Sequence, residues 1–291
     1  MTRRDWLESA LPLLPLAGSH SVAYGSSQAS RGGSLFGDAA VFDSRSRKLL
    51  SQEGDCHQAT LPGSTLQPFV LAALLERRLV APDERLECPG GFRLGSRNLE
   101  CIHVRNAGPL DAVEALATSC NSWFAVMARR LGPEGLLKAL RVFGLTAQRA
   151  RSDEQVCLQA LGLAHVAASP LTLARAYAAL FDTGPPALVL QGMRAAVERG
   201  TAQRASSTVA WIAGKTGTAP GGLPGSSVGW FGGWAMRDAS TGQSACPAAE
   251  IAACLHSRPG IVFAVRVAGG TGGGAAAEQA KELAERWARA S

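Results

Sequence analysis

Residues 62–69 read Pro-Gly-Ser-Thr-Leu-Gln-Pro-Phe and carry a serine from a turn into the start of a helix. The Pro-Gly pair marks the turn, and the spacing of the apolar residues that follow predicts a helix over residues 64–80. The first N–H groups of a helix lack intrahelical partners, and the helix dipole is positive at this end. Both features would stabilise an oxyanion beside Ser64, whereas the simpler interpretation is an ordinary serine N-cap.

A second polar motif, Ser119-Cys120-Asn121, interrupts a helix that the apolar spacing predicts over residues 111–130. The hydroxyl of Ser119 donates and accepts hydrogen bonds, and the amide of Asn121 does both at its two ends. These groups suit a site that holds a peptide backbone or relays a proton. Serine and asparagine also occur at helix interruptions without such a role.

A third motif, Gly-Lys-Thr-Gly-Thr-Ala at residues 214–219, lies in a predicted strand. The edge of a strand offers backbone hydrogen bonds to an extended substrate. Lys215 supplies a cation and Thr216 and Thr218 supply hydroxyls, which together suit a carboxylate. Gly217 has no side chain, so another backbone has room to approach. Lys-Thr-Gly alone is a short match that also occurs by chance.

Composition narrows the class of protein. The 291 residues suffice for one large or two moderate domains with a hydrophobic core. Charged residues are only 18% of the chain, which argues against disorder, and the net charge of +6 permits an anionic polymer as partner without requiring one. No dense Lys/Arg run has aromatic residues between its members, so we expect no nucleic acid. No apolar stretch approaches the roughly 18 residues of a membrane span, which excludes an integral membrane protein.

The order of the predicted elements defines a fold class. Strands lie toward both ends of the chain, helices lie between them, and residues 88–108 are predicted to form a loop. This order predicts an α+β fold in which helices flank an antiparallel β-sheet and an all-helical subdomain is inserted. The predicted strands are a hairpin over 38–50, two strands within 210–238 and one over 261–268, and further helices are predicted over 133–142, 170–181 and 275–290.

The N-terminus has the organisation of an export signal. A charged start containing Arg3-Arg4 precedes a short apolar stretch, and small residues suit cleavage near Ala23. The arginine pair resembles a twin-arginine signal. We therefore expect an exported protein of the periplasm or cell envelope, with a signal peptide at 1–23, a linker at 24–37 and a domain at 38–291. The alternative is a frayed amphipathic N-terminus.

Seven cysteines are compatible with an oxidising compartment. Cys88 with Cys101, and Cys246 with Cys254, flank short segments and could form local disulfides, while the alternative is that several cysteines are small buried apolar residues. The sequence has no Cys-x-x-Cys pair and no histidine at zinc-site spacing. We therefore expect no metal and no cofactor.

The order and spacing of the three motifs resemble the penicillin-binding serine D,D-peptidase family, and its transpeptidase domain in particular, whose motifs are S-x-x-K, S-D-N and K-T-G. The resemblance extends collinearly over residues 39–290. It implies the fold shared by penicillin-binding transpeptidases and serine β-lactamases, which agrees with the α+β fold predicted from the element order. Segments that carry it outside the motifs are 88–91, 115–131, 169–177, 193–202, 229–233 and 269–277.

Gln67 is the main departure from the family pattern, because the family has lysine at this position of the first motif. Positions 64 and 67 share one face of a helix, so the residue at 67 lies beside the serine. Glutamine stays neutral and accepts no proton near pH 7. The loss of a positioned base costs about 10²–10⁴ in rate. Lys215 is the candidate replacement base, provided that burial or a nearby cation lowers its pKa.

The resemblance also implies roles and partners. Ser64 would attack the carbonyl between two terminal D-alanines of a peptidoglycan stem peptide, with the N–H groups of Ser64 and Thr218 as oxyanion hole. Ser119 would relay the proton, and β-lactams would acylate Ser64 as mimics of the dipeptide. Any glycan-polymerising partner would be a separate chain. The substrate-binding residues would be Asn121, Thr216, Gly217 and Thr218, with Lys215 beside them.

Two classes of function follow from this pattern. One is a slow acyl-serine transferase, either a transpeptidase or a carboxypeptidase. The other is a non-catalytic module that binds peptidoglycan or β-lactams, which Gln67 favours because the base is missing. A serine β-lactamase or a penicillin-sensor domain is a weaker alternative.

Overall fold

The computed structural model describes residues 37–103, 108–184, 186–237, 253 and 258–290. The predicted signal peptide, nearly all of the predicted linker, and both Cys246 and Cys254 lie outside these residues. Among the helices that are described, none is both long enough and apolar enough to cross a membrane.

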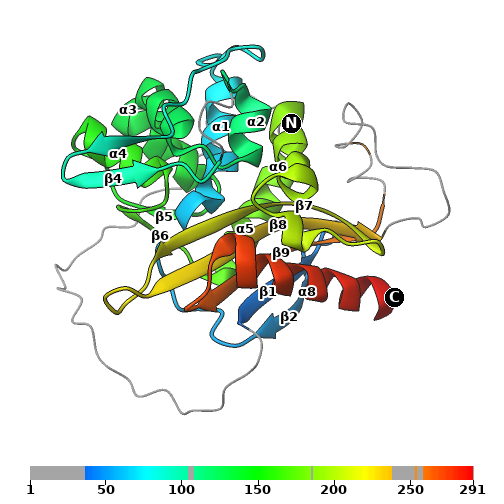
Figure 1. Cartoon of the computed structure of the whole chain (residues 1–291). Coiled ribbons are helices and arrows are strands. Elements are labelled where there is room, and N and C mark those ends of the chain that lie inside the picture. The colour runs from blue at the N-terminus through cyan, green and yellow to red at the C-terminus, as the bar shows by residue number, and fades with distance from the viewer. Residues whose placement is uncertain (1–36, 104–107, 185, 238–252, 254–257, 291) are drawn as a thin grey trace, which may run out of the picture. The chain divides into compact units, whose positions relative to one another are not determined.

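A five-stranded antiparallel sheet in the order β2-β1-β9-β8-β7 forms the centre of the described domain (Figure 1). β1 pairs with both β2 and β9, so the first and last of the described strands are neighbours. The strands of this sheet are β1 (Asp38–Asp43), β2 (Leu49–Glu53), β7 (Ala210–Pro220), β8 (Ser227–Arg237) and β9 (Gly260–Ala268). This is the predicted hairpin followed, late in the chain, by the three predicted strands.

Within the described residues, the α-helices with stated bounds are α1 (Gln67–Glu76), α2 (Ala112–Ala117), α3 (Asn121–Val142), α4 (Asp153–Ala160), α5 (Pro170–Asp182), α6 (Ala187–Arg199) and α8 (Ala277–Ala290). Short elements are the 3-10 helices η2 (Gly63–Leu66) and η3 (Gln203–Ala205), the π-helical turn η4 (Gly272–Ala276), and the hairpins formed by β3 (Gly91–Leu94) with β4 (Arg97–Glu100) and by β5 (Thr146–Ala147) with β6 (Val166–Ala167).

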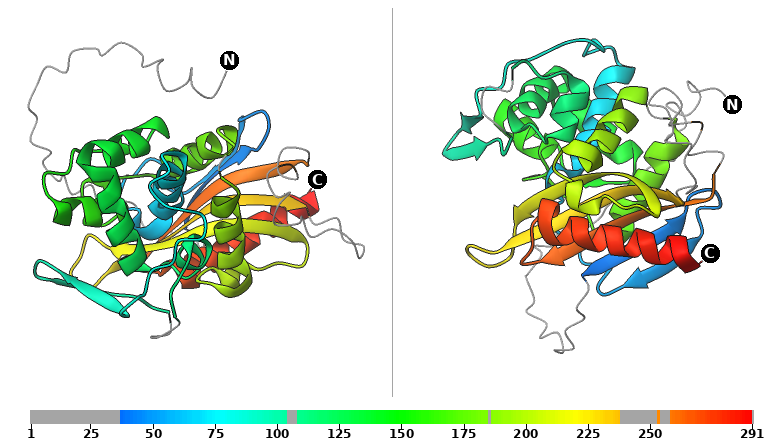
Figure 2. Two further views of the ribbon diagram at one scale, coloured as in Figure 1. Left: turned by 90° about the horizontal axis from the view of Figure 1, so that it is seen from above. Right: turned by 45° about the vertical axis from the view of Figure 1, so that its right-hand side comes forward.

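Both faces of the sheet are covered by helices, which explains why its central strands are buried almost throughout. Side chains alternate between faces along a strand. Trp230 and Trp234 of β8 therefore join the core under α5, whereas Phe231 joins the core under α8, where its ring stacks on Phe263 at 5.7 Å. The three views of the ribbon show α8 along one face of the sheet and α5 behind it (Figures 1 and 2).

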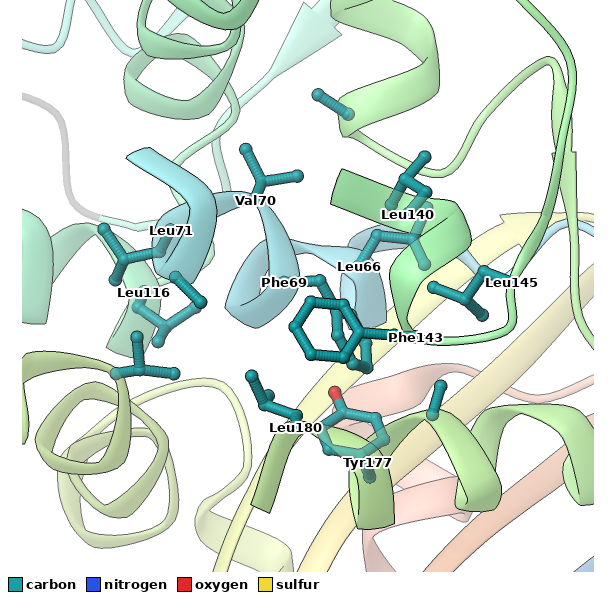
Figure 3. Close-up of a cluster of buried hydrophobic side chains, with 14 of the residues drawn as sticks. Leu66, Phe69, Val70, Leu71, Leu116, Leu140, Phe143, Leu145, Tyr177 and Leu180 are labelled. Atoms are coloured by element: carbon teal, nitrogen blue, oxygen red, sulfur yellow. The ribbon is translucent and has the colours of Figure 1, made fainter. Parts of the chain in front are cut away.

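α1 is the central helix of the helical part of the domain. It is apolar around its whole circumference and buried along most of its length, as expected for a helix surrounded by other elements. Phe69 packs on Phe143 and Tyr177, with ring centroids 5.2 and 4.9 Å away (Figure 3). The helix that carries the first motif is therefore fixed from several sides.

Three sequence predictions need correction. The segment 88–108, expected to be a loop, contains the β3–β4 hairpin, in which Phe92 pairs with Leu99 and both pack on neighbouring core residues. The helix expected to reach residue 80 ends at Glu76, and Arg78 adopts a left-handed φ of 56°. Neither α4 nor α6 was predicted. Tertiary packing decides the β3–β4 hairpin, because the local pattern of its four-residue strands is weak.

Candidate active site

The turn that carries Ser64 is pressed against β7. Ser64 lies in η2 directly before α1 and is partly exposed. A Cβ atom at Gly217 would lie 2.4 Å from the carbonyl oxygen of Pro62, and one at Gly63 would lie 2.8 Å from that of Thr218. Gly63 also has a φ of 57°. Glycine at both positions thus allows the backbone of the first motif to touch that of the third.

Two distant side chains hold this turn in place. The hydroxyl of Tyr177 in α5 donates to the carbonyl oxygen of Thr65 at 2.8 Å, and the indole N–H of Trp230 in β8 donates to that of Leu61 at 3.0 Å. Burial raises the pKa of Tyr177 well above its ordinary value, so its hydroxyl remains a donor. Sequence reasoning missed both residues, since nothing local marks a partner 112 or 169 positions away.

Gln67 joins the first motif to the second. It is the first residue of α1, is fully buried, and accepts a hydrogen bond from the hydroxyl of Ser119 at 3.3 Å. Its Nε2 has no hydrogen-bond partner among the described residues. Ser119 lies in the break between α2 and α3 with a φ of 57°. The position that is lysine in the family motif therefore contacts the second motif, and here that contact is made by a neutral amide.

Asn121 is anchored to the β3–β4 hairpin. Its Nδ2 donates to the carbonyl oxygen of Glu100 at 2.8 Å, and the residue is only partly buried. The side-chain carbonyl and the second amide hydrogen are not used in that bond. Asn121 can therefore orient a ligand amide without losing its structural contact.

Lys215 is fully buried in β7. Its Nζ donates to the carbonyl oxygen of Thr216 at 2.9 Å. Burial deprives the ammonium of water and lowers the pKa of Lys215 from 10.5 to about 7. A substantial fraction of the amine is therefore neutral and able to accept a proton near neutral pH.

The two threonines of the third motif differ in exposure. Thr216 is buried, and its hydroxyl shares a hydrogen bond of 2.7 Å with that of Thr201. Thr218 is exposed, and its hydroxyl accepts from the N–H of Gly272 at 2.9 Å. The strand is thus held on both sides, while Thr218 remains accessible to solvent.

A cysteine cluster next to the second motif was not predicted. Cys88, Cys101, His103 and Cys120 bring their side chains together, and Cys88 and Cys101 are free thiols with sulfur atoms 3.6 Å apart. The local disulfide considered for this pair is therefore not formed in the structure. The hydrogen bond with Cys120 lowers the pKa of the Cys101 thiol, while that bond and burial raise the pKa of Cys120. A search for Cys-x-x-Cys pairs misses such a cluster, but Cys101-x-His103 is a local signal of it.

The chain belongs to the penicillin-binding protein transpeptidase family, because residues 37–190 match the model of the penicillin binding protein transpeptidase domain. Among curated proteins, penicillin-binding protein PbpB of Mycolicibacterium smegmatis is 32% identical over 84 residues, which are 29% of this chain and 13% of that protein. The aligned segment is therefore a small part of that relative.

Solved structures match over most of the chain. The transpeptidase domain of Burkholderia pseudomallei penicillin-binding protein 3 gives a TM-score of 0.71 at 20% identity, covering 88% of each chain. Pseudomonas aeruginosa PBP2, solved in complex with WCK 5153, gives a TM-score of 0.70 at 20% identity, covering 87% of this chain and 71% of that one. These matches confirm the predicted fold class.

Proposed function

We propose that this chain is an exported penicillin-binding protein that binds D-Ala-D-Ala stem peptides and β-lactams. These ligands slowly acylate Ser64. The observation that carries the proposal is that the first motif, with its partly exposed Ser64, contacts both of the others. Buried Gln67 bonds to Ser119 at 3.3 Å, and the backbone at Gly63 lies against that of Thr218. The fold supports a serine site, and Gln67 supports impaired chemistry.

The reaction assigns one role to each group. The Ser64 oxygen attacks the carbonyl between the two D-alanines, the acyl-serine bond forms, and the peptide bond to the terminal D-alanine breaks. The N–H groups of Ser64 and Thr218 stabilise the oxyanion. Ser119 relays the serine proton to the leaving amine. The substrate amide is oriented by Asn121, and the terminal carboxylate is bound beside Lys215, Thr216, Gly217 and Thr218. A second amine or water then releases the acyl group.

Removal of the serine proton is the slow part of this scheme. Gln67 cannot accept it, because an amide is not a base near neutral pH. Lys215 is the best replacement, since burial lowers its pKa to about 7. It acts from the strand rather than from the helix position beside the serine, so we propose that it replaces the family's lysine only in part.

The test is acylation by a fluorescent penicillin, followed by intact mass over time. We expect slow labelling of the unmodified chain and none of Ser64→Ala. Gln67→Lys should label faster by about 10²-fold or more, because it restores a positioned base. Gln67→Met is the matched control, of similar length but without a basic group, and should stay slow. Fast labelling of the unmodified chain would refute the impairment.

Gln67 also favours a second function, a non-catalytic module that binds stem peptides or β-lactams. Its signature would be saturable binding of a D-Ala-D-Ala peptide with no adduct, even in Gln67→Lys. Export is tested on its own by sequencing the N-terminus of the mature protein from the cell envelope, where we expect cleavage near Ala23.

A further inference from the structure

Four potential metal ligands meet beside the second motif. The sulfur atoms of Cys88 and Cys101 are 3.6 Å apart and those of Cys101 and Cys120 are 3.9 Å apart. With His103 included, one ligand atom from each residue lies within 4.8 Å of all the others. Cys88 lies just before β3, Cys101 and His103 follow β4, and Cys120 is the N-cap of α3. Three separate segments therefore converge on one point.

These distances fit a metal ion better than a disulfide. A disulfide joins sulfur atoms at about 2.05 Å. In a tetrahedral zinc site, bonds of about 2.3 Å place two sulfur ligands about 3.8 Å apart. The two separations between the sulfur atoms, 3.6 and 3.9 Å, lie on either side of that value. The cluster thus has the spacing of a coordination sphere before any ion is placed in it.

Backbone and hydroxyl groups already surround the sulfur atoms as they surround metal-bound thiolates. The N–H of Gly90 donates to Cys88 and that of Trp123 donates to Cys120, both at 3.4 Å. The hydroxyl of Ser122 lies 3.6 Å from the sulfur of Cys101. Such partners outside the coordination sphere orient and stabilise ligands in metal sites. All three cysteines are at most 9% exposed, so an unbound thiolate there would be poorly solvated.

We propose that Cys88, Cys101, His103 and Cys120 bind one divalent transition-metal ion, with zinc as the preferred ion, in a closed structural site. Three thiolates and an imidazole are a ligand set that selects zinc over magnesium or calcium. Four protein ligands leave no open position for water or substrate, so the ion has a structural rather than a catalytic role.

The ion would connect the second motif to the β3–β4 hairpin. Cys120 lies between Ser119 and Asn121, and Asn121 bonds to Glu100, the residue before Cys101. A metal ion bound by both Cys120 and Cys101 would therefore link the same two segments as that hydrogen bond. Together they fix the break between α2 and α3 at which Ser119 contacts Gln67. The ligands are thus positioning residues for the motif and do not touch the substrate.

The test is a cobalt titration of the full chain, reduced, stripped of metal with a chelator and desalted. We expect one Co²⁺ per chain, with the thiolate-to-cobalt charge-transfer absorption and the intense visible bands of a tetrahedral site, and displacement of Co²⁺ by Zn²⁺. Added Zn²⁺ should also raise the unfolding temperature. Cys101→Ser should bind Co²⁺ at least tenfold more weakly, and its charge-transfer absorption should be weaker at saturation because only two thiolates remain.

Controls separate this site from other thiols and from acylation. Cys56→Ser removes a buried thiol outside the cluster that bonds to the carbonyl oxygen of Ala39, a bond that serine can also make, and it should bind Co²⁺ unchanged. Ser64→Ala should also bind unchanged, so the site can be present even if Ser64 proves inert. If Cys101→Ser does not fold, His103→Gln replaces it as the variant with a missing ligand, because His103 is only half-buried.

Two outcomes would overturn the proposal. One is the absence of thiolate-to-cobalt absorption in the reduced, folded chain. The other is a Cys88–Cys101 disulfide, shown by peptide mass spectrometry, in protein isolated without reductant, since thiols in a disulfide cannot bind the ion as thiolates.

Discussion

At the scale of the residue, Gln67 and Lys215 are both fully buried, and only one of them can carry a charge. A lysine at position 67 would add a second cation to a site that is already poorly solvated, and burial of a charge is costly unless it is paired. Glutamine avoids this cost and keeps the contact with Ser119 at 3.3 Å. The chain therefore retains a connected site while losing the base that the family motif supplies.

Lys215 makes stability depend on pH. Burial lowers its pKa from 10.5 to about 7, so between these values the unfolded chain binds a proton that the folded chain does not. The free energy of unfolding should therefore rise with pH across this window, by up to about 1.4 kcal/mol per pH unit, and the full cost of burying the charge applies below pH 7. Urea unfolding at several pH values gives the free energy of unfolding as a function of pH. We expect that free energy to rise less steeply with pH in Lys215→Met. Equal slopes would contradict this assignment.

At the scale of the element, β7 and the turn before α1 fit together only because Gly217 lacks a side chain. A Cβ there would lie 2.4 Å from a backbone oxygen, which cannot move aside as a flexible side chain does. We expect Gly217→Ala to lower the free energy of unfolding by about 1–3 kcal/mol, as overpacking does. Gly222→Ala, in the loop after β7, is the matched control, because a Cβ there meets nothing within 4 Å. It should change stability by less than about 0.5 kcal/mol, and a similar effect of both changes would disprove the close fit.

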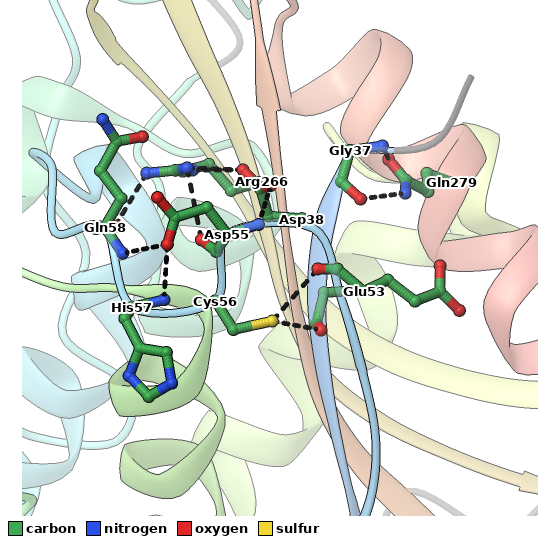
Figure 4. A network of polar contacts seen from close by, with 10 residues as sticks. Gly37, Asp38, Glu53, Asp55, Cys56, His57, Gln58, Arg266 and Gln279 are labelled. Carbon is green, nitrogen blue, oxygen red and sulfur yellow. Dashed lines mark hydrogen bonds and ion pairs between the residues drawn. The ribbon is translucent and has the colours of Figure 1, made fainter. Parts of the chain in front are cut away.

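At the scale of the whole molecule, Arg266 links β9, near the C-terminal end of the described chain, to β1 near its N-terminal end. Its guanidinium in β9 binds the carboxylate of Asp38 in β1, with Nε–Oδ2 at 2.8 Å, and donates to the carbonyl oxygen of Gln58 at 2.8 Å (Figure 4). The Arg266 side chain is 5% exposed, so the pair is largely shielded from water. These contacts also fix the loop that leads from β2 to the turn carrying Ser64.

Arg266→Met should therefore destabilise the domain strongly. Asp38 would keep a charge without its partner, and the carbonyl oxygen of Gln58 would lose its donor, so we expect a loss of about 3 kcal/mol in the free energy of unfolding. Arg289→Ala removes an i,i+4 pair with Glu285 from a largely exposed arginine and should cost less than about 0.5 kcal/mol. Thermal unfolding of both variants compares the two pairs, and comparable losses would show that burial is not the deciding factor.

The sequence by itself determined the fold class, the three motifs and the family, because these depend on local signals. The Pro-Gly turn before Ser64, the break at residues 119–121 and the apolar runs of the late strands are each set by neighbouring residues, whose conformational preferences do not require the rest of the chain. The same locality explains why Gln67 was visible as a departure from the motif.

Only the tertiary structure decided what these residues contact. Four features of the site depend on segments far apart in the sequence. They are the bond between Ser119 and Gln67, the burial that lowers the pKa of Lys215, the hydrogen bond from Tyr177 to the turn that carries Ser64, and the cluster of Cys88, Cys101, His103 and Cys120. Such contacts are specified by the packing of all the elements together, and no single short stretch of sequence contains all the residues that take part in one of them.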